Sequence, residues 1–183
     1  MSKENADKEQ KRSFKREVFS WIACIVVTIL LTEFILNFVI INANIPSGSM
    51  ENTIMTNDKL IALRTSYWFN DPKRGDIIIF KYPDDESQLF IKRLIGLPGD
   101  TVEIRNGKVF INGVEDEKAN SHVPETPTGN YGPYVVPEGS YFMLGDNREH
   151  SKDSRFWQNT FVTYDEIVGK LSLIHISEPT RPY

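Results

Sequence analysis

The longest apolar run of the sequence, residues 18–41, constrains the fold more than any other feature. Its 24 residues would form a helix of about 36 Å at 1.5 Å per residue, which is enough to cross a bilayer with some tilt. Trp21 near its start is suited to anchoring the run at the membrane interface. We therefore expect a transmembrane anchor, followed by a domain formed by residues 42–171.

The charges on either side of this run predict its orientation. Four basic residues precede it closely: Lys11, Arg12, Lys15 and Arg16. Because positive flanks stay on the cytoplasmic side, residues 1–17 would be a disordered, basic cytoplasmic tail, and everything after Asn42 would lie outside. A cleaved secretion signal is the rival interpretation, with Ala43-Asn44 as a weak cleavage site, but the run is long for such a signal.

One ionisable residue, Glu33, interrupts the run, and Asn37 lies one helical turn further along the same face. An ionisable group within a membrane is costly and often has a function. Glu33 is also only two turns from the outer end, from where its carboxylate could reach the interface. Both interpretations stay open.

The sequence after the run is typical of an all-β domain. Short apolar runs separated by Gly, Pro, Asn and Asp predict strands at residues 59–63, 76–80, 89–95, 101–104, 109–111 and 141–144. Asn106-Gly107 predicts a two-residue hairpin turn, since both residues tolerate positive φ. Residues 115–137, with four prolines, predict a surface loop, and residues 172–183 are a tail of doubtful origin without an assigned function. The expected fold is a mostly β domain preceded by one N-terminal transmembrane helix.

Composition argues against several classes of function. The 21 Lys and Arg residues against 25 Asp and Glu give no sign of a basic face for nucleic acid. The single cysteine, Cys24, lies within the apolar run and cannot form an intramolecular disulfide. No spacing of Cys, His, Asp or Glu suggests a metal site, and nothing predicts a cofactor.

A candidate nucleophile, Ser49, lies eight residues past the apolar run in Ile45-Pro46-Ser47-Gly48-Ser49-Met50. Eight extended residues reach about 27 Å, so this serine would act close to the membrane surface. Proline and glycine in the turn could hold its hydroxyl clear of the backbone, although most serines in such turns only bond locally. A serine becomes a nucleophile only beside a base.

Lys92 is the stronger candidate base. On a strand at 89–95 it would share a face with Phe90 and Leu94, where burial would lower its pKa and leave a neutral amine. From the strand alone, a second interpretation stays open, in which the stem of the lysine packs and its ammonium group reaches water.

His150 is the rival base. It could form a triad with Ser49 and either Asp146 or Asp153. A histidine in such a polar segment is more often solvated.

Four sequence blocks resemble one protein family when they are taken together. They are Pro46-Ser47-Gly48-Ser49-Met50 and residues 74–80, 91–100 and 145–155. In this order after an apolar span, they resemble bacterial type I signal peptidases, the leader peptidases, over roughly residues 18–170. The ordered set is highly specific, although no single block would be.

The resemblance implies a membrane-bound serine endopeptidase with Ser49 as nucleophile and Lys92 as general base. Its substrates would be exported preproteins, from which it would remove signal peptides after small residues at −1 and −3, on the outer face of the cytoplasmic membrane. The implied partners are signal peptides and the lipid bilayer, with the secretion translocon as a further candidate. We expect the substrate to bind as an extended strand.

The resemblance also implies roles for five neighbouring residues. The hydroxyl of Ser47, with the backbone N–H of the nucleophile, would bind the oxyanion. Ser151 would hydrogen-bond to the lysine amine and orient it. An aspartate in its place would raise the pKa of the amine and keep it charged. Asp153 and Arg155 would form a supporting ion pair, and Asp146 would shape the loop.

The chain departs from the family pattern at several points. Asn52 stands where the family often has proline, and the segment between residues 100 and 145 is as short as in Gram-positive members. Many members carry two spans where one is visible here, and the sequence departs after Gly169. Two alternatives stay open: a serine/lysine peptidase with a narrower substrate, such as a pilin- or relaxase-processing relative, and a catalytically silent, anchored β domain that binds partners.

Three apolar residues near Ser49 have two interpretations. Met50, Ile54 and Met55 either dip into the lipid and bring the site to the membrane, or pack in the core of the domain.

Overall fold

The computed structural model describes residues 3–44, 48–51, 53–54, 59–123 and 128–172. The chain divides into two compact units, Met1–Val39 and Ile40–Tyr183. The first unit is helical: α1 spans Lys3–Phe34, and one π-helical turn follows at Ile35–Val39. Phe14–Val39, with a mean hydropathy of 2.4, is long and apolar enough to cross a membrane.

Two expectations about this unit are corrected. The segment expected to be a disordered tail, residues 1–17, is helical from Lys3 onward. Its Glu, Lys, Gln and Arg residues favour helix, and no Gly or Pro separates them from the apolar run. The transmembrane helix expected at 18–41 ends two residues earlier, at Val39, because Ile40 and Ile41 begin the first strand.

The helix pairs its own polar residues. Asn37 Nδ2 donates to the backbone carbonyl oxygen of Glu33 at 2.9 Å and to its Oε2 at 3.1 Å. The spacing of one turn that was read from the sequence therefore gives a hydrogen bond within the helix.

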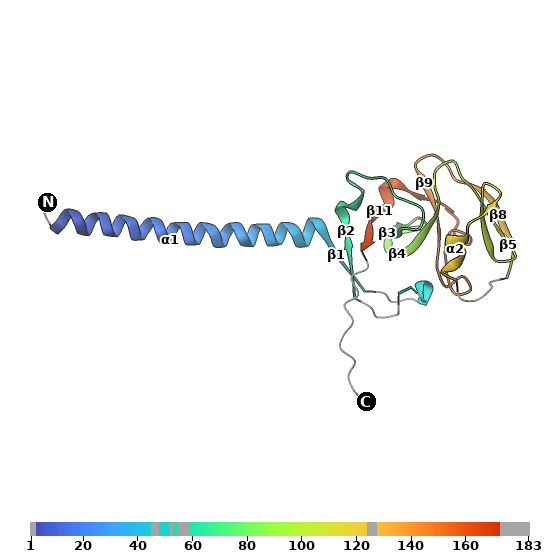
Figure 1. Ribbon diagram of the computed structural model, residues 1–183, viewed down its shortest axis with the longest axis horizontal. Helices are drawn as coiled ribbons and strands as arrows, with labels where there is room; N and C mark the ends of the chain where they lie inside the picture. Colours follow the sequence, from blue (N-terminus) through green and yellow to red (C-terminus); the bar gives the residue numbers. More distant parts are fainter. Residues whose placement is uncertain (1–2, 45–47, 52, 55–58, 124–127, 173–183) are drawn as a thin grey trace, which may run out of the picture. The chain divides into compact units, whose positions relative to one another are not determined.

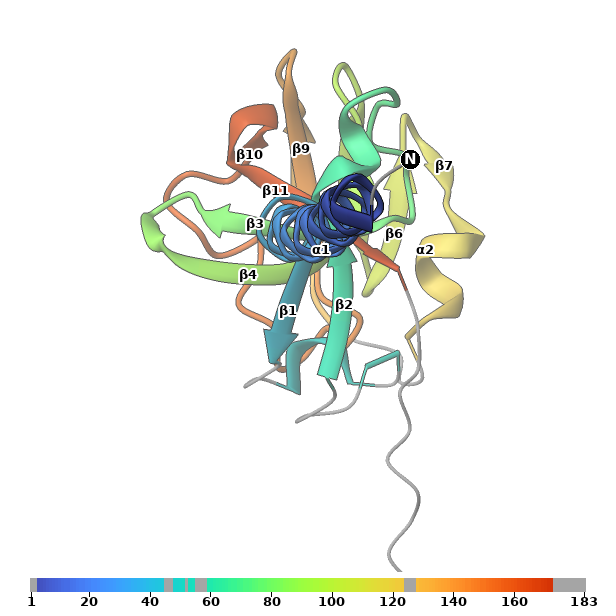
Figure 2. The same cartoon turned by 90° about the vertical axis from the view of Figure 1, so that its left-hand side faces the viewer.

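The second unit is a β domain of two antiparallel sheets (Figure 1). The larger sheet has the order β1-β2-β11-β3-β4-β9-β10. Its strands are β1 Ile40–Asn44, β2 Lys59–Leu63, β3 Ile77–Tyr82, β4 Asp85–Gly96, β9 Ser140–Leu144, β10 Val162–Thr163 and β11 Ile167–Ser172. Strong twist turns β4 across the direction of β1 and β2 (Figure 2).

The smaller sheet lies with α2 at the end of the domain away from β1 and β2 (Figure 1). Its order is β7-β6-β5-β8. Its elements are β5 Thr101–Arg105, β6 Lys108–Ile111, β7 Val114–Glu115, α2 Glu117–Ser121 and β8 Tyr131–Val135.

The mostly β fold class expected from the sequence is confirmed, and so is the hairpin predicted at Asn106-Gly107. Arg105 pairs with Lys108 across a turn in which Asn106 and Gly107 have φ of 47° and 77°. β2 has the predicted bounds. The expected surface loop at 115–137 is wrong, because it contains α2 and β8.

The core lies on both faces of the larger sheet. Ile77 and Ile79 pack on one face with residues of β1, β2 and β11, and Ile78 and Phe80 pack on the other. Met50 and Ile54 are each 1% exposed and belong to the first cluster. For these two residues, the prediction of core packing is therefore confirmed and the prediction of lipid contact is wrong. Met55 lies outside the described residues.

Candidate active site

The turn that carries Ser49 is a short 3₁₀ helix, Gly48–Met50. Its conformation continues through backbone hydrogen bonds from Thr53 and Ile54 to the carbonyl oxygen of Met50, at 3.1 and 2.9 Å. Because Met50 and Ile54 are buried in the core, their packing holds the turn in place. Ser49 itself is only 6% exposed. Ser47, the other predicted residue of this turn, lies outside the described residues.

Asn147 holds the same turn from the opposite side. Its backbone N–H donates to the carbonyl oxygen of Ser49, and its Nδ2 donates to that of Gly48, both at 3.1 Å. Two consecutive carbonyls of the turn are thus tied to the loop that follows β9. Sequence reasoning assigned Asn147 no role, although it stands within the Gly-Asp-Asn block.

Lys92 meets Ser49 from β4. Its Nζ lies 2.5 Å from Ser49 Oγ, and its side chain is on the face of the strand that also carries Phe90. Lys92 is 3% exposed, which rules out the solvated ammonium group that the sequence left open. Burial lowers the pKa of Lys92 from 10.5 to about 8; the nearby Asp153 and Asp146 oppose this effect.

Asp153 and Arg155 form a buried ion pair beside the lysine. Arg155 Nε lies 2.8 Å from Asp153 Oδ1, and Arg155 Nη2 lies 2.9 Å from Asp153 Oδ2. The backbone N–H of Gly145 donates to the same carboxylate at 3.1 Å. With these donors, the carboxylate is compensated locally, and the positive charge of Arg155 itself lowers the pKa of Lys92.

Asp146 is engaged by an arginine that sequence reasoning missed. Arg93 Nε and Nη2 donate to its two carboxylate oxygens at 2.8 and 2.7 Å, and the hydroxyl of Thr53 donates at 2.5 Å. Arg93 also donates to the carbonyl of Gly75. Alternation along β4 places Lys92 and Arg93 on opposite faces, so one strand supplies both the candidate base and the cation that neutralises Asp146.

Ser151 is buried, but it does not make the predicted hydrogen bond. Among the described residues, its Oγ has no hydrogen-bond partner, whereas Lys92 is bonded to Ser49. The hydroxyl packs against Gly145: a Cβ there would clash with the Ser151 side chain and would lie 2.6 Å from the carbonyl oxygen of Ser49. Because Gly145 has no side chain, the loop that carries Ser151 can approach the turn that carries Ser49.

Arg148 was also missed by the sequence reasoning. It is 3% exposed, and it donates to the carbonyls of Gly145 and of Ala119 in α2. Burial lowers its pKa to about 10. A buried arginine with backbone partners leaves no sequence signal beyond its place in a polar block.

The rival base, His150, is exposed, and its Nδ1 lies 3.3 Å from Asn147 Oδ1. The two carboxylates suggested for a triad are those of Asp146 and Asp153, and both are bonded to arginines. In the described parts of the chain, no group of three or more His, Cys, Asp and Glu could hold a metal ion. The chemistry that this geometry supports is proton transfer between a buried amine and a serine hydroxyl.

Comparisons with known proteins point to one family. The family model described as signal peptidase, peptidase S26, matches residues 18–176. A probable signal peptidase I-2 from Synechocystis sp. is 40% identical over 151 residues, which cover 79% of this chain and 67% of the relative. Signal peptidase I P from Bacillus subtilis subsp. natto is 37% identical over 170 residues, which cover 88% of this chain and 90% of the relative.

A crystal structure of a signal peptidase I from Enterococcus faecalis is 39% identical in sequence and has a TM-score of 0.47, covering 56% of this chain and 98% of that chain. The family match alone extends over most of the sequence, from the apolar helix to β11. The chain therefore belongs to the signal peptidase family, peptidase S26, and is a serine peptidase.

Proposed function

We propose that this protein is a membrane-anchored signal peptidase I that cleaves preproteins with a serine/lysine dyad, Ser49 and Lys92. The observation that carries the proposal is the 2.5 Å contact between Lys92 Nζ and Ser49 Oγ in a buried site. With a pKa of about 8, the amine is neutral in roughly a tenth of the molecules at pH 7. That fraction is large enough for lysine to act as a general base.

The reaction has two halves. The neutral amine of Lys92 takes the proton of the Ser49 hydroxyl as Oγ attacks the scissile carbonyl. The resulting oxyanion is bound by the Ser49 backbone N–H and the Ser47 hydroxyl, and the ammonium group then gives its proton to the leaving amine. Water releases the acyl group in the second half, with Lys92 again as the base.

The surrounding charges support this role. Carboxylates near Lys92 would raise its pKa and remove the base, but Asp146 is bonded to Arg93 and Asp153 to Arg155. Burial then outweighs the carboxylates, and the pKa of Lys92 is lowered. We assign Ser151 the role of orienting the amine during turnover, because its buried hydroxyl has no hydrogen-bond partner among the described residues.

The family and the apolar helix support a proposal for the substrate and the location. The substrate would bind extended, with small residues at −1 and −3 in shallow pockets that exclude larger side chains. Phe14–Val39 would anchor the enzyme in the cytoplasmic membrane, with the basic N-terminus inside and the β domain on the outer face. Lipid and signal peptides would be its partners there, and the secretion translocon is a further candidate.

The test uses the full chain purified in detergent and a preprotein whose signal ends in Ala-x-Ala. We expect cleavage after the second alanine, loss of cleavage when the −1 alanine is replaced by leucine, and no cleavage by the Ser49→Ala variant. Ser140→Ala, which alters a buried serine of β9, is the matched control and should retain activity.

Cleavage by Ser49→Ala would overturn the mechanism. An inactive parent protein that is folded would favour the silent β domain, and cleavage of one narrow substrate only would favour the specialised peptidase. The contact between Ser49 and Lys92 disfavours the silent domain, since a binding module needs no such pair.

A further inference from the structure

Two aromatic side chains, Tyr131 and Phe156, lie against the guanidinium group of Arg155. Arg155 Cζ is 5.3 Å from the centre of the Tyr131 ring and 4.9 Å from the centre of the Phe156 ring, within the range of cation–π contacts. The two ring centres are 5.6 Å apart, and the ring planes lie at 83° to each other. The guanidinium group therefore lies between two nearly perpendicular rings, and we call Tyr131 and Phe156 the aromatic corner.

The two rings of the aromatic corner come from different parts of the domain. Tyr131 is the first residue of β8, and it is paired with Ile104 of β5 in the smaller sheet. Phe156 directly follows Arg155 in the segment between β9 and β10. The aromatic corner thus joins the smaller sheet to the segment that carries the buried ion pair of Asp153 and Arg155.

Core packing alone does not account for Phe156. The residue is 53% exposed, whereas the Arg155 side chain beside it is only 4% exposed. Guanidinium groups are weakly hydrated and stack well on aromatic faces. A half-exposed ring next to an almost inaccessible guanidinium group therefore acts as a cover that keeps water away from the cation.

The covered guanidinium group directs its N–H groups towards the site. Arg155 Nε and Nη2 donate to the two carboxylate oxygens of Asp153 at 2.8 and 2.9 Å, and Nη2 also donates to the carbonyl oxygen of Arg148 at 2.6 Å. Because the guanidinium group is planar, rings against it restrict its rotation away from these partners. Loss of a ring would let the Arg155 side chain turn towards solvent and weaken its pairing with Asp153.

The position of Arg155 matters for the charge balance at Lys92. Burial lowers the pKa of Lys92 to about 8, Asp153 raises it, Arg155 lowers it, and Asp146 raises it. Asp146 is paired with Arg93 and does not depend on the aromatic corner. The balance between Asp153 and Arg155 does depend on it.

Two further ionisable groups lie near this ion pair. Arg148, whose pKa is lowered by burial to about 10, is a cation held by backbone carbonyls. Burial raises the pKa of Tyr134 above its usual value of 10.0, so its hydroxyl is neutral. Neither group changes its charge near pH 8, where the amine of Lys92 does.

We propose that Tyr131 and Phe156 are positioning residues for the reaction, which hold Arg155 on Asp153 and so maintain the charge balance in which Lys92 acts as the base. The inference rests on the proposed serine/lysine mechanism and extends it by two residues that act through Arg155. It also gives the smaller sheet a part in catalysis, because β8 supplies one of the two rings.

The test measures kcat/KM between pH 6 and pH 10, with the full chain in detergent and an Ala-x-Ala preprotein. Tyr131→Leu and Phe156→Leu each remove one ring and keep an apolar side chain. We expect each to raise the pH at which log kcat/KM levels off by about half a unit, because Asp153 is then less well neutralised. That shift lowers kcat/KM about threefold at pH 7 and leaves it nearly unchanged at pH 9.5.

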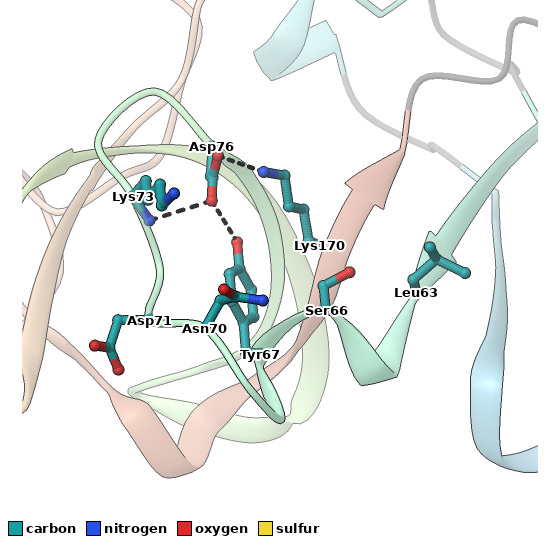
Figure 3. A pocket seen from close by; sticks show the side chains of 8 residues that line it. All are labelled: Leu63, Ser66, Tyr67, Asn70, Asp71, Lys73, Asp76 and Lys170. Atoms are coloured by element: carbon teal, nitrogen blue, oxygen red, sulfur yellow. Dashed lines mark hydrogen bonds and ion pairs between the residues drawn. The ribbon is translucent and has the colours of Figure 1, made fainter.

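Conservative variants and a remote tyrosine provide the controls. Tyr131→Phe and Phe156→Tyr keep both rings and should have the parent profile. Tyr67→Leu is matched to Tyr131→Leu, because the Tyr67 hydroxyl also lies beside a carboxylate–cation pair (Figure 3). It donates to Asp76 Oδ2 at 2.9 Å, and Asp76 Oδ1 accepts from Lys170 Nζ at 2.7 Å.

The groups around Tyr67 border a polar pocket of about 410 Å³. The carboxylates that raise the pKa of Lys92 are those of Asp153 and Asp146, so the Asp76 pair is a remote one. Tyr67→Leu should therefore lower the melting temperature and keep the parent pH profile.

The outcomes separate this inference from the proposed function. A parent protein that does not cleave, or whose kcat/KM does not rise with pH, would refute the serine/lysine dyad itself. If the parent profile levels off near pH 8 and neither leucine variant shifts it, only the role of the aromatic corner is refuted.

A loss of kcat/KM by the same factor at every pH would show that the rings only support the fold, and it would also overturn the inference. Thermal melting in the same detergent shows whether each variant is folded. Phe156→Leu changes a half-exposed side chain, so it decides the test if Tyr131→Leu does not fold.

Discussion

Replacing Lys92 with methionine should stabilise the protein while abolishing its activity. Methionine has a similar length and fills the same buried space without a charge. A pKa lowered from 10.5 to about 8 means that the buried amine costs about 3 kcal/mol of folding free energy at neutral pH. Loss of the hydrogen bond to Ser49 offsets about 1 kcal/mol, so we expect a net gain of about 2 kcal/mol.

The sign of this effect depends on pH. Between about pH 8 and pH 10.5, the unfolded chain holds a proton on Lys92 and the folded protein does not, so stability rises with pH in this window. Below pH 8 the whole cost is present. The advantage of Lys92→Met should therefore be about 2 kcal/mol at pH 7 and close to zero by pH 9.5.

Urea unfolding in one detergent, at pH 7 and pH 9.5, measures this difference. Lys81→Met is the control, since Lys81 is a partly exposed lysine of β3 in a surface pair with Glu86 and its substitution should change stability by less than about 0.5 kcal/mol. A Lys92→Met variant that is less stable than the parent at pH 7, or whose gain does not depend on pH, would refute the reasoning. Retained cleavage would refute the assignment of Lys92 as the base.

Three further substitutions test the framework of the site. Asp146→Asn leaves the buried Arg93 without its partner charge, and it should lower the free energy of unfolding by about 3 kcal/mol, measured by urea unfolding. Gly145→Ala forces Ser151 away from the nucleophile turn and should lower kcat by about tenfold or more with a smaller change in KM; an unchanged kcat would contradict the contact. Gly107→Ala places a Cβ at a φ of 77° and should cost about 1 kcal/mol without affecting kcat, measured by thermal melting and cleavage.

The parts of the fold that could be predicted are those that local sequence determines. Asn106-Gly107 carries its own turn conformation, and β2 has apolar residues between polar boundaries. β8 was missed because its pairing with β5 comes from distant residues, and because Pro133 and the prolines on either side of the strand argued for a loop. β1 was missed because its isoleucines continue the apolar run, and only pairing with β2 separates them from it.

The site divides in the same way. Alternation along one strand was enough to suggest that Lys92 is buried, because that pattern is local. The pairing of Arg93 with Asp146 joins residues 53 positions apart, and no local pattern predicts it. The Ser151 hydroxyl packs against Gly145 and has no hydrogen-bond partner among the described residues, and only the folded backbone determines this packing.

The most direct test of the serine/lysine dyad is the pH dependence of kcat/KM for an Ala-x-Ala preprotein in detergent. We predict that log kcat/KM rises with unit slope below pH 8 and levels off near pH 8, as the Lys92 amine loses its proton in the free enzyme. His150→Ala should leave this profile in place, and Lys92→Ala should be inactive at every pH. A profile that levels off near 6.5 and disappears in His150→Ala, or cleavage by Lys92→Ala, would contradict the dyad.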